Sequence, residues 1–311
     1  MMRFPLPADT FPPLLLSEED QVELQKLAEG FVHEAFEEYT DFRCVDGGVL
    51  DKERWKAVKT RDGVTSYRDL RMVDPERSRV APKEKVGSSQ MTASTKLHGV
   101  LAVGTVPGEF NDMAFGLVNA TTEMLKLKSS YTNDKIADAK VLAAIVEPTP
   151  TEPARGIVHQ SIAVPATADA LMSFSKVVHC GQMKKLNWLL KTTKTVILDR
   201  HSDDCTVCGK PVSRSKSCQV CLSTMCSRCA VTKKLSFLSP TSRRVSRRSL
   251  TFCVRCILAA YKADALDIAA EELVRQNPFD FYERSTGSSA SSKAPSPSNS
   301  IPPDATSEFF G

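Results

Sequence analysis

Eight of the ten cysteines in this chain form four Cys-x2-Cys pairs, and this feature limits the fold more than any other. The pairs are Cys205/Cys208, Cys218/Cys221, Cys226/Cys229 and Cys253/Cys256, separated by gaps of nine, four and twenty-three residues. A Cys-x2-Cys turn places two thiolates on one metal ion, and a tetrahedral zinc site needs four. The pattern therefore predicts two Zn²⁺ ions, with all eight cysteines as ligands.

A disulfide framework is the alternative reading of the same cysteines. The N-terminus offers only Leu14-Leu15-Leu16 as an apolar run, so it lacks the core of a signal peptide. No run approaches the ~18 apolar residues of a membrane span. We therefore expect an intracellular, cytoplasmic protein, in which clustered cysteines usually bind metal, and zinc is favoured over disulfides.

Charge is distributed unevenly along the 311 residues. From Arg200 to Cys256 there are 12 Lys and Arg against 2 Asp, while the whole chain has 41 basic and 37 acidic residues. A mildly acidic body thus carries a basic cysteine-rich region, which would meet any anionic partner. We expect no nucleic-acid partner. The alternative interpretation of this basic charge is that a small domain with little core simply has a charged surface.

Residues 1–16 are rich in proline and are expected to be extended. Ser17, followed by three acidic residues, predicts the start of a helix. Apolar residues then recur at helical spacing from Leu24 to Tyr39, which predicts one long amphipathic helix. A partner-binding face is one interpretation of this stripe, and burial in the core is the favoured one.

The rest of residues 17–198 shows an α+β pattern. Strands are expected at 55–59 and 64–70 around Arg61-Asp62-Gly63, and at 97–106, 141–146 and 157–164. Short helices are expected within 110–126, and a long helix from Pro165 to about Lys191. We expect residues 71–90 to form a loop. The order predicts helices at both ends of one curved antiparallel sheet.

Four sequence segments in this region carry a resemblance to a known family. They are residues 54–59 (RWKAVK), 103–106 (VGTV), 128–131 (KSSY) and 179–186 (HCGQMKKL). They resemble the oomycete family that joins a START-like, helix-grip domain to a FYVE-type zinc finger. The resemblance implies a shortened START-like domain at 17–198, with a lipid as its ligand, and a finger with a C-terminal helix at 199–276.

The spacing of the cysteines is similar to that of FYVE-type fingers over all eight ligand positions. The spacing alone leaves interleaved and sequential pairing open. The resemblance implies interleaving, a cross-brace with Cys205, Cys208, Cys226 and Cys229 on one zinc and the other four cysteines on the second. A RING finger would normally have a histidine shortly before Cys226, and residues 222–225 contain none.

FYVE fingers typically bind phosphatidylinositol 3-phosphate on endosomal membranes through a basic motif around the third cysteine. Here Arg214 and Lys216 are the candidate headgroup ligands, while both histidines and the later arginine of the motif are missing. The glycine after the fourth cysteine is replaced by Leu222. A phosphate needs several convergent donors, so weaker attraction to anionic membranes is favoured over specific recognition.

Residues 277–311 contain nine Ser and five Pro and are expected to be disordered. The tripeptide Asn277-Pro278-Phe279 at their start resembles the ligand of EH domains, and a plain helix stop is the favoured interpretation.

No pattern of catalytic residues is present, and closed tetrathiolate zinc sites are structural. We therefore expect a non-enzymatic zinc-binding adaptor on membranes, peripheral on endosomes, or alternatively a protein-interaction scaffold. A ubiquitin ligase is disfavoured by the spacing.

Overall fold

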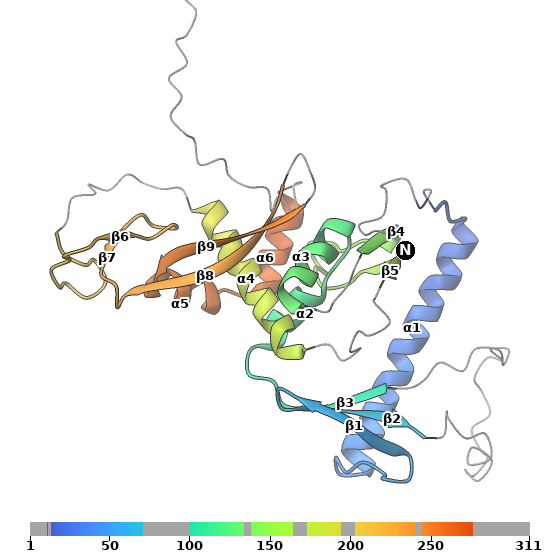
Figure 1. The fold of residues 1–311 in the computed structure, drawn as a ribbon. Coiled ribbons are helices and arrows are strands. Elements are labelled where there is room, and N and C mark those ends of the chain that lie inside the picture. Colours follow the sequence, from blue (N-terminus) through green and yellow to red (C-terminus); the bar gives the residue numbers. More distant parts are fainter. Residues whose placement is uncertain are drawn as a thin grey trace, which may run out of the picture.

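The computed structural model describes residues 11, 14–70, 100–133, 138–163, 173–193, 203–239 and 244–275. Within these residues the fold is mixed α and β, with six α-helices, one π-helical turn and four small antiparallel sheets (Figure 1). The loop predicted at 71–90 and the tail at 277–311, with its Asn277-Pro278-Phe279 tripeptide, lie outside the described residues.

Helix α1 (Glu18–Thr40) begins where the sequence predicts. The Ser17 side chain accepts a hydrogen bond from the backbone N–H of Asp20, and the Asp20 side chain accepts from the backbone of Ser17, which closes a capping box. The helix runs into the π-helical turn η1 (Asp41–Val45). No residue of α1 is buried. The expectation that its apolar stripe forms part of the core is therefore wrong.

The predicted hairpin is present and belongs to a three-stranded sheet. Strands β1 (Trp55–Arg61) and β2 (Val64–Asp69) pair around Asp62 and Gly63, whose φ angles of 50° and 79° give the left-handed turn that hairpins prefer. Strand β3 (Val100–Gly104) pairs with β2.

A second, separate sheet contains β4 (Asp138–Val146) and β5 (Ile157–Ala163). Among the described residues, these two strands do not pair with the first three. The prediction of one curved antiparallel sheet is therefore wrong, and α1 lies alongside both sheets instead of closing over one (Figure 1).

Helices α2 (Phe110–Leu117), α3 (Thr122–Thr132) and α4 (Phe174–Thr192) form the helical body. Two glycines let α2 and α4 touch. A Cβ on Gly116 would lie 2.3 Å from the carbonyl oxygen of Val177, and one on Gly181 would lie 1.9 Å from that of Asp112. These positions exclude any side chain, since real Cβ contacts are longer.

The cysteine-rich region contains β6 (Lys216–Ser217), β7 (Thr224–Met225), β8 (Ala230–Leu238) and β9 (Val245–Cys253). Strands β8 and β9 pair over their full length as a long hairpin, here called the β8–β9 ribbon. The single helix expected after Cys256 is two helices, α5 (Val254–Lys262) and α6 (Ala265–Val274). Asp264 between them caps α6, because its side chain accepts from the N–H groups of Leu266 and Asp267.

One hydrophobic cluster joins the helical body to the cysteine-rich region, across the domain boundary expected at 198–199. From α3 and α4 it includes Leu127, Tyr131, Cys180, Met183 and Leu186. From the other side come Val220, Met225, Leu235, Phe237, Leu238, Phe252, Ile257 and Ala260. The two regions therefore share a single core.

Candidate metal centre

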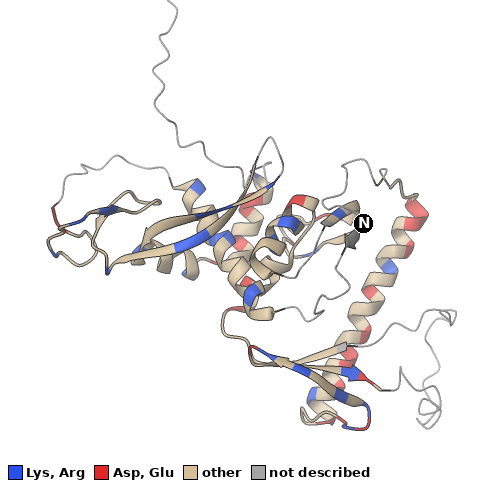
Figure 2. Cartoon of the chain, in the orientation of Figure 1, with Lys and Arg blue, Asp and Glu red and all other residues tan. Residues whose placement is uncertain are grey.

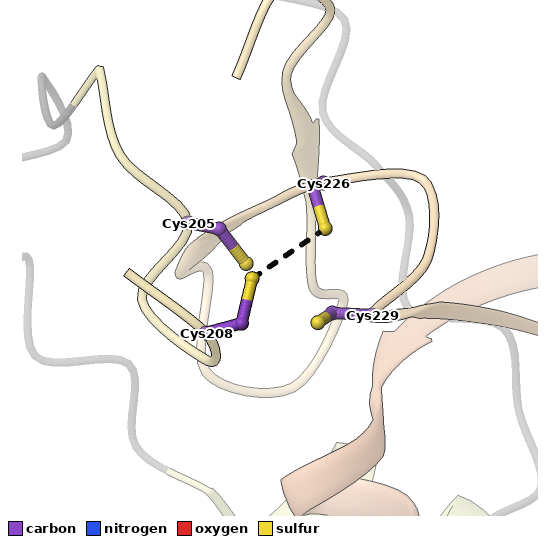
Figure 3. Close-up of side chains that lie close together, drawn as sticks. All are labelled: Cys205, Cys208, Cys226 and Cys229. Carbon is purple, nitrogen blue, oxygen red and sulfur yellow. Dashed lines mark hydrogen bonds between the residues drawn. The ribbon is translucent and has the colours of Figure 1, made fainter. Parts of the chain in front are cut away.

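Four cysteines from two of the Cys-x2-Cys pairs meet at the end of the molecule distant from α1. Cys205, Cys208, Cys226 and Cys229 point their sulfur atoms toward one another, all within 4.8 Å (Figure 3). Turns of the backbone supply both pairs: the N–H of Gly209 donates to the carbonyl of Cys205 at 2.7 Å, and the N–H of Cys229 donates to that of Cys226 at 3.1 Å.

The remaining four cysteines form a second quartet. The sulfur atoms of Cys218, Cys221, Cys253 and Cys256 also lie within 4.8 Å of one another. Cys253 is the N-cap of α5, which sets its partner Cys256 in the first turn of that helix. Alternate pairs thus share a site, and the interleaved cross-brace that the resemblance implied is confirmed.

The spacing of the sulfur atoms fits zinc. Four sulfurs placed 2.3 Å from one central ion lie about 3.8 Å apart. The observed separations are 3.8 Å between Cys208 and Cys226, and 3.9 Å between Cys221 and Cys253. A disulfide requires about 2.05 Å. All ten cysteines are free thiols, so each quartet is built to hold one Zn²⁺ ion.

Electrostatics within each quartet also favour a cation. A hydrogen bond from the Cys256 thiol lowers the pKa of Cys218 to about 4, and the same bond raises the pKa of Cys256. In the first quartet, backbone hydrogen bonds, chiefly from Cys226, lower the pKa of Cys205 to about 6, while burial raises that of Cys229 to about 12. Four adjacent thiolates repel one another, and a bound dication removes this penalty.

The two sites share a left-handed backbone conformation after one Cys-x2-Cys pair and differ in the residue that adopts it. Gly209 follows the first Cys-x2-Cys pair with φ of 68°, and Leu222 follows the second with φ of 57°. Both N–H groups donate back to the first cysteine of their pair. Leu222 therefore adopts the left-handed conformation that glycine supplies at position 209, at a cost of about 1 kcal/mol.

The ribbon that connects the two sites is fastened to the helical body by a tyrosine. The hydroxyl oxygen of Tyr131 on α3 accepts from the backbone N–H of Ser236 at 2.7 Å, and the hydroxyls of Ser130 and Ser236 are 2.8 Å apart. The ring of His179 on α4 meets Tyr131 edge to face. Ser130, Tyr131 and His179 all belong to the segments that carry the START-like resemblance, so those segments form the contact with the ribbon.

Lys184, buried on α4, holds the C-terminal end of α2. Its Nζ donates to the carbonyl oxygens of Phe115 at 2.7 Å and Val118 at 3.3 Å. The ammonium also lies 4.7 Å from the ring centre of Phe115. Burial lowers the pKa of Lys184. The carbonyls at a helix end lack partners within the helix, so a cation there is favourable.

Lys185, the next residue, does the same for α5. Its Nζ donates to the carbonyl oxygens of Tyr261 and Ala263, both at 2.9 Å, and pairs with the Asp112 carboxylate of α2 at 2.6 Å. Both members of this ion pair are buried. Two adjacent lysines of α4 thus cap one helix of the body and one helix of the finger.

A buried carboxyl group lies on α6 near this pair. Burial raises the pKa of Glu272 to about 7, opposed by the charges of Lys184 and Lys191. Within the described residues, its Oε2 and both side-chain polar atoms of Asn187 have no hydrogen-bond partner. An unpaired buried carboxyl is destabilising when ionised.

Other site predictions are placed as follows. Arg214 and Lys216 are exposed on and beside β6, away from any enclosed site, and their role with a headgroup stays a prediction. The β8–β9 ribbon was not among the elements predicted from the sequence. A signal for it was present, since the β-branched residues Val231, Thr232 and Val245 favour strands.

Two hollows flank α2. One of about 310 Å³ lies among residues of β2, β3 and the start of α4, and one of about 350 Å³ borders β5; both are lined by Phe110 and Met113. Each is at the lower end of small-ligand sites. Within the described part of the chain, no helix combines the length and apolarity needed to cross a bilayer.

Comparison with known proteins does not identify the chain: no family model, curated protein or solved structure matches it. The double zinc finger therefore rests on the two cysteine quartets themselves.

Proposed function

We propose that the protein is a non-catalytic, zinc-binding adaptor that attaches peripherally to anionic membranes through the β8–β9 ribbon. The observation that supports this is the charge of the ribbon. From Ala230 to Cys253 the sequence has six Lys and Arg and no acidic residue. Lys234, Arg244, Arg247 and Arg248 are exposed, and the basic residues follow β8 and β9 in Figure 2.

Each lysine or arginine near an anionic surface contributes about 1 kcal/mol. The zinc sites support this arrangement indirectly, since Cys229 and Cys253 are ligands at the end of the ribbon where β8 begins and β9 finishes, and Phe252 beside them is buried in the finger core. A rigid ribbon keeps its charges on one element, whereas a loop would lose conformational entropy on binding.

Liposome flotation tests the proposal. The zinc-loaded chain should float with phosphatidylserine-rich vesicles and not with phosphatidylcholine vesicles. The double variant Lys234→Glu with Arg247→Glu should lose flotation. A control with the same change of net charge, Lys52→Glu with Lys56→Glu, alters two exposed residues of the N-terminal region and should float normally. Equal loss in both variants would contradict a role for the ribbon.

A further set of vesicles addresses the finer proposals. Stronger flotation with phosphatidylinositol 3-phosphate than with its 4-phosphate isomer, abolished by Arg214→Gln with Lys216→Gln, would establish specific endosomal recognition. A lipid in the hollows beside α2 should remain bound in native mass spectrometry and be displaced by Met113→Trp.

The second candidate function is a protein-interaction scaffold that binds no lipid. The exposed apolar stripe of α1 favours this candidate, because soluble proteins seldom present such a face without a partner.

A further inference from the structure

Helix α1 presents a continuous apolar face to solvent. Five large side chains of α1 that share this stripe are exposed: Phe31 at 46%, Val32 at 70%, Phe36 at 67%, Tyr39 at 59% and Leu27 at 40%. With Leu24, Ala28 and Ala35 they follow the spacing of one helix face. The face spans about 22 Å from Leu24 to Tyr39.

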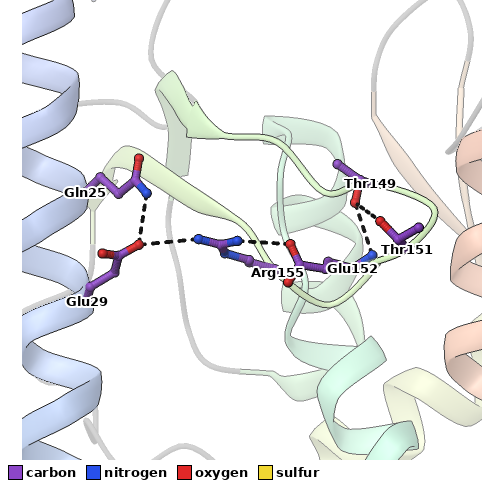
Figure 4. A network of polar contacts seen from close by, with 6 residues as sticks. All are labelled: Gln25, Glu29, Thr149, Thr151, Glu152 and Arg155. Atoms are coloured by element: carbon purple, nitrogen blue, oxygen red, sulfur yellow. Dashed lines mark hydrogen bonds and ion pairs between the residues drawn. The ribbon is translucent and has the colours of Figure 1, made fainter.

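Among the described residues, the ion pairs that hold α1 lie beside this face and do not cover its exposed side chains. Glu29 pairs with Arg155 at 3.3 Å, and Arg155 also pairs with Glu152 (Figure 4). Glu38 pairs with Arg54 at 2.7 Å. Glu29 and Glu38 are nine positions apart and therefore lie on opposite sides of the helix. The Glu29–Arg155 pair is exposed and contributes little. Arg54 is partly buried and also pairs with the buried Asp69 of β2, so it joins the C-terminal part of α1 to the first sheet.

Helices in proteins owe most of their stability to the packing of an amphipathic face, and α1 buries no residue. Gly30, near its middle, weakens it further, and a Cβ there would meet nothing within 4 Å. The capping box at Ser17 sets where the helix begins, and the two ion pairs set its orientation. They do not supply the buried apolar contact that usually stabilises an amphipathic helix.

The charge of α1 identifies the kind of partner. Its 23 residues contain eight Asp and Glu and a single lysine, Lys26, and Figure 2 shows the acidic residues along the helix. Two copies of α1 would bring sixteen carboxylates together, which disfavours self-association. The same charge is repelled by an anionic membrane.

The basic finger of another copy is also a poor partner for α1. Its ribbon supplies positive charge, but Leu235, Phe237 and Phe252 are buried in its own core. The partner must offer both an apolar face and flanking Lys or Arg residues. A helix with those two properties can lie along α1 and use anchors at the spacing of helical turns.

We propose that α1 is the docking face for a basic amphipathic helix of a partner protein. Phe31 and Phe36 lie at the centre of the contact, and the acidic residues of α1, among them Glu23 and Glu34, flank it. The proposal gives the scaffold function its partner class, and it does not depend on membrane binding by the ribbon. Helix α1 lies at the opposite end of the molecule from the zinc finger (Figure 1).

The test uses the full zinc-loaded chain in the absence of vesicles, so its result is independent of the flotation experiment. The probe is a synthetic amidated helix with leucine on one face and lysine on both flanks, labelled for fluorescence anisotropy. Two control peptides carry the same composition in scrambled order, and glutamate in place of lysine. Only the first peptide should bind.

The chain variants locate the contact. Phe31→Ser with Phe36→Ser should weaken binding about a hundredfold, since each buried phenyl ring contributes about tenfold. Glu23→Gln with Glu34→Gln should weaken it severalfold and reduce its dependence on salt. Lys26→Ser with His33→Ser, on the opposite face, should leave the affinity unchanged. Circular dichroism and zinc content verify that each variant is folded.

Three results would overturn the proposal. The scrambled peptide could bind as well as the patterned one, which would make the contact one of charge alone. The Phe31 and Phe36 variant could bind with unchanged affinity. Sedimentation velocity could show a dimer of the chain that the same variant dissociates, which would make a second copy the occupant of the face.

Discussion

The two long helices of this protein have similar apolar patterns but differ in how many of their residues are buried. Helix α1 has 23 residues and buries none, whereas α4 has 19 residues and buries nine of them. The difference lies in their neighbours. Helix α4 packs on α2, α3, α5 and α6 and shares a core with the zinc finger. Helix α1 contacts β4 and forms ion pairs with Arg54, just before β1, and with Arg155, in the loop between β4 and β5.

The comparison shows what a pattern of apolar residues means. It identifies a helix face that needs apolar contacts. Whether those contacts come from the same chain or from a partner depends on the rest of the fold. In α4 the face is covered by α2 and α3 and by the zinc finger, whose fold depends on metal. In α1 the cover is left to a partner. Four predictions test this contrast.

Removal of zinc should have the largest effect and should be confined to the side of α4. The expected loss is on the order of 10 kcal/mol per site. Native mass spectrometry should show two zinc ions per chain, and Cys218→Ser should remove one. Hydrogen exchange should then accelerate in α3, α4 and β8, and should be unchanged in α1. Cys44→Ser, at an exposed thiol outside both quartets, is the control. Unchanged exchange in α4 without zinc would break the comparison.

A matched pair of leucine substitutions should separate the two helices directly. Leu186 on α4 is fully buried, and Leu27 on α1 is 40% exposed. Leu186→Ala should cost about 3 kcal/mol, and Leu27→Ala no more than about 0.5 kcal/mol. Urea unfolding of the zinc-loaded chain measures both. Similar costs would mean that α1 packs on the molecule more closely than its exposure indicates.

The buried carboxyl near α4 should make stability depend on pH. Burial raises the pKa of Glu272 from its ordinary 4.5 to about 7, so the folded state favours the protonated group. Its stabilising contribution is complete below pH 4.5 and is lost as pH rises through 7, on the order of 3 kcal/mol in total. Glu272→Gln should therefore be more stable than the parent chain at pH 8 and lack this decline. Urea titrations at several pH values, with zinc present, measure it, and parallel curves for both chains would contradict it.

The smallest effects should come from the residues that follow the Cys-x2-Cys pairs. Gly209→Leu should cost about 1 kcal/mol, because it places a side chain at a φ of 68°. Leu222→Gly removes the same strain from the other site and should gain less than about 1 kcal/mol, since glycine has greater entropy in the unfolded chain. Competition with a chromophoric chelator measures zinc affinity in both variants. Opposite signs support strain at Leu222, and a loss in both would refute it.

Local patterns predicted local structure well. The cysteine spacing indicated two zinc sites because each Cys-x2-Cys turn is set by its own few residues. Ser17 marked the start of α1, and Asp62-Gly63 marked the hairpin. The cross-brace followed from the resemblance, since spacing cannot tell which distant pairs meet.

Apart from the missed β8–β9 hairpin and the division of the last helix into α5 and α6, the failures concerned tertiary structure. Nothing in the stripe from Leu24 to Tyr39 distinguishes a buried face from an exposed one. Residue type alone would place Lys184 and Lys185 on the surface, because lysine is almost never fully buried unless paired. Their partners are carbonyl oxygens at the ends of α2 and α5, and such partners cannot be recognised in a sequence.

These two lysines also determine which changes of length the chain tolerates. Neighbouring positions on a helix point 100° apart, which is how one turn of α4 reaches the ends of two helices on different sides. One residue inserted between Gly181 and Lys184 would turn the pair by that angle, away from Phe115 and Tyr261, while Gly181 stayed against Asp112. An insertion in α4 should therefore be far more damaging than a substitution. The number of residues from the glycine contact to the lysine pair, and not only their identity, sets the orientation of the finger on the body.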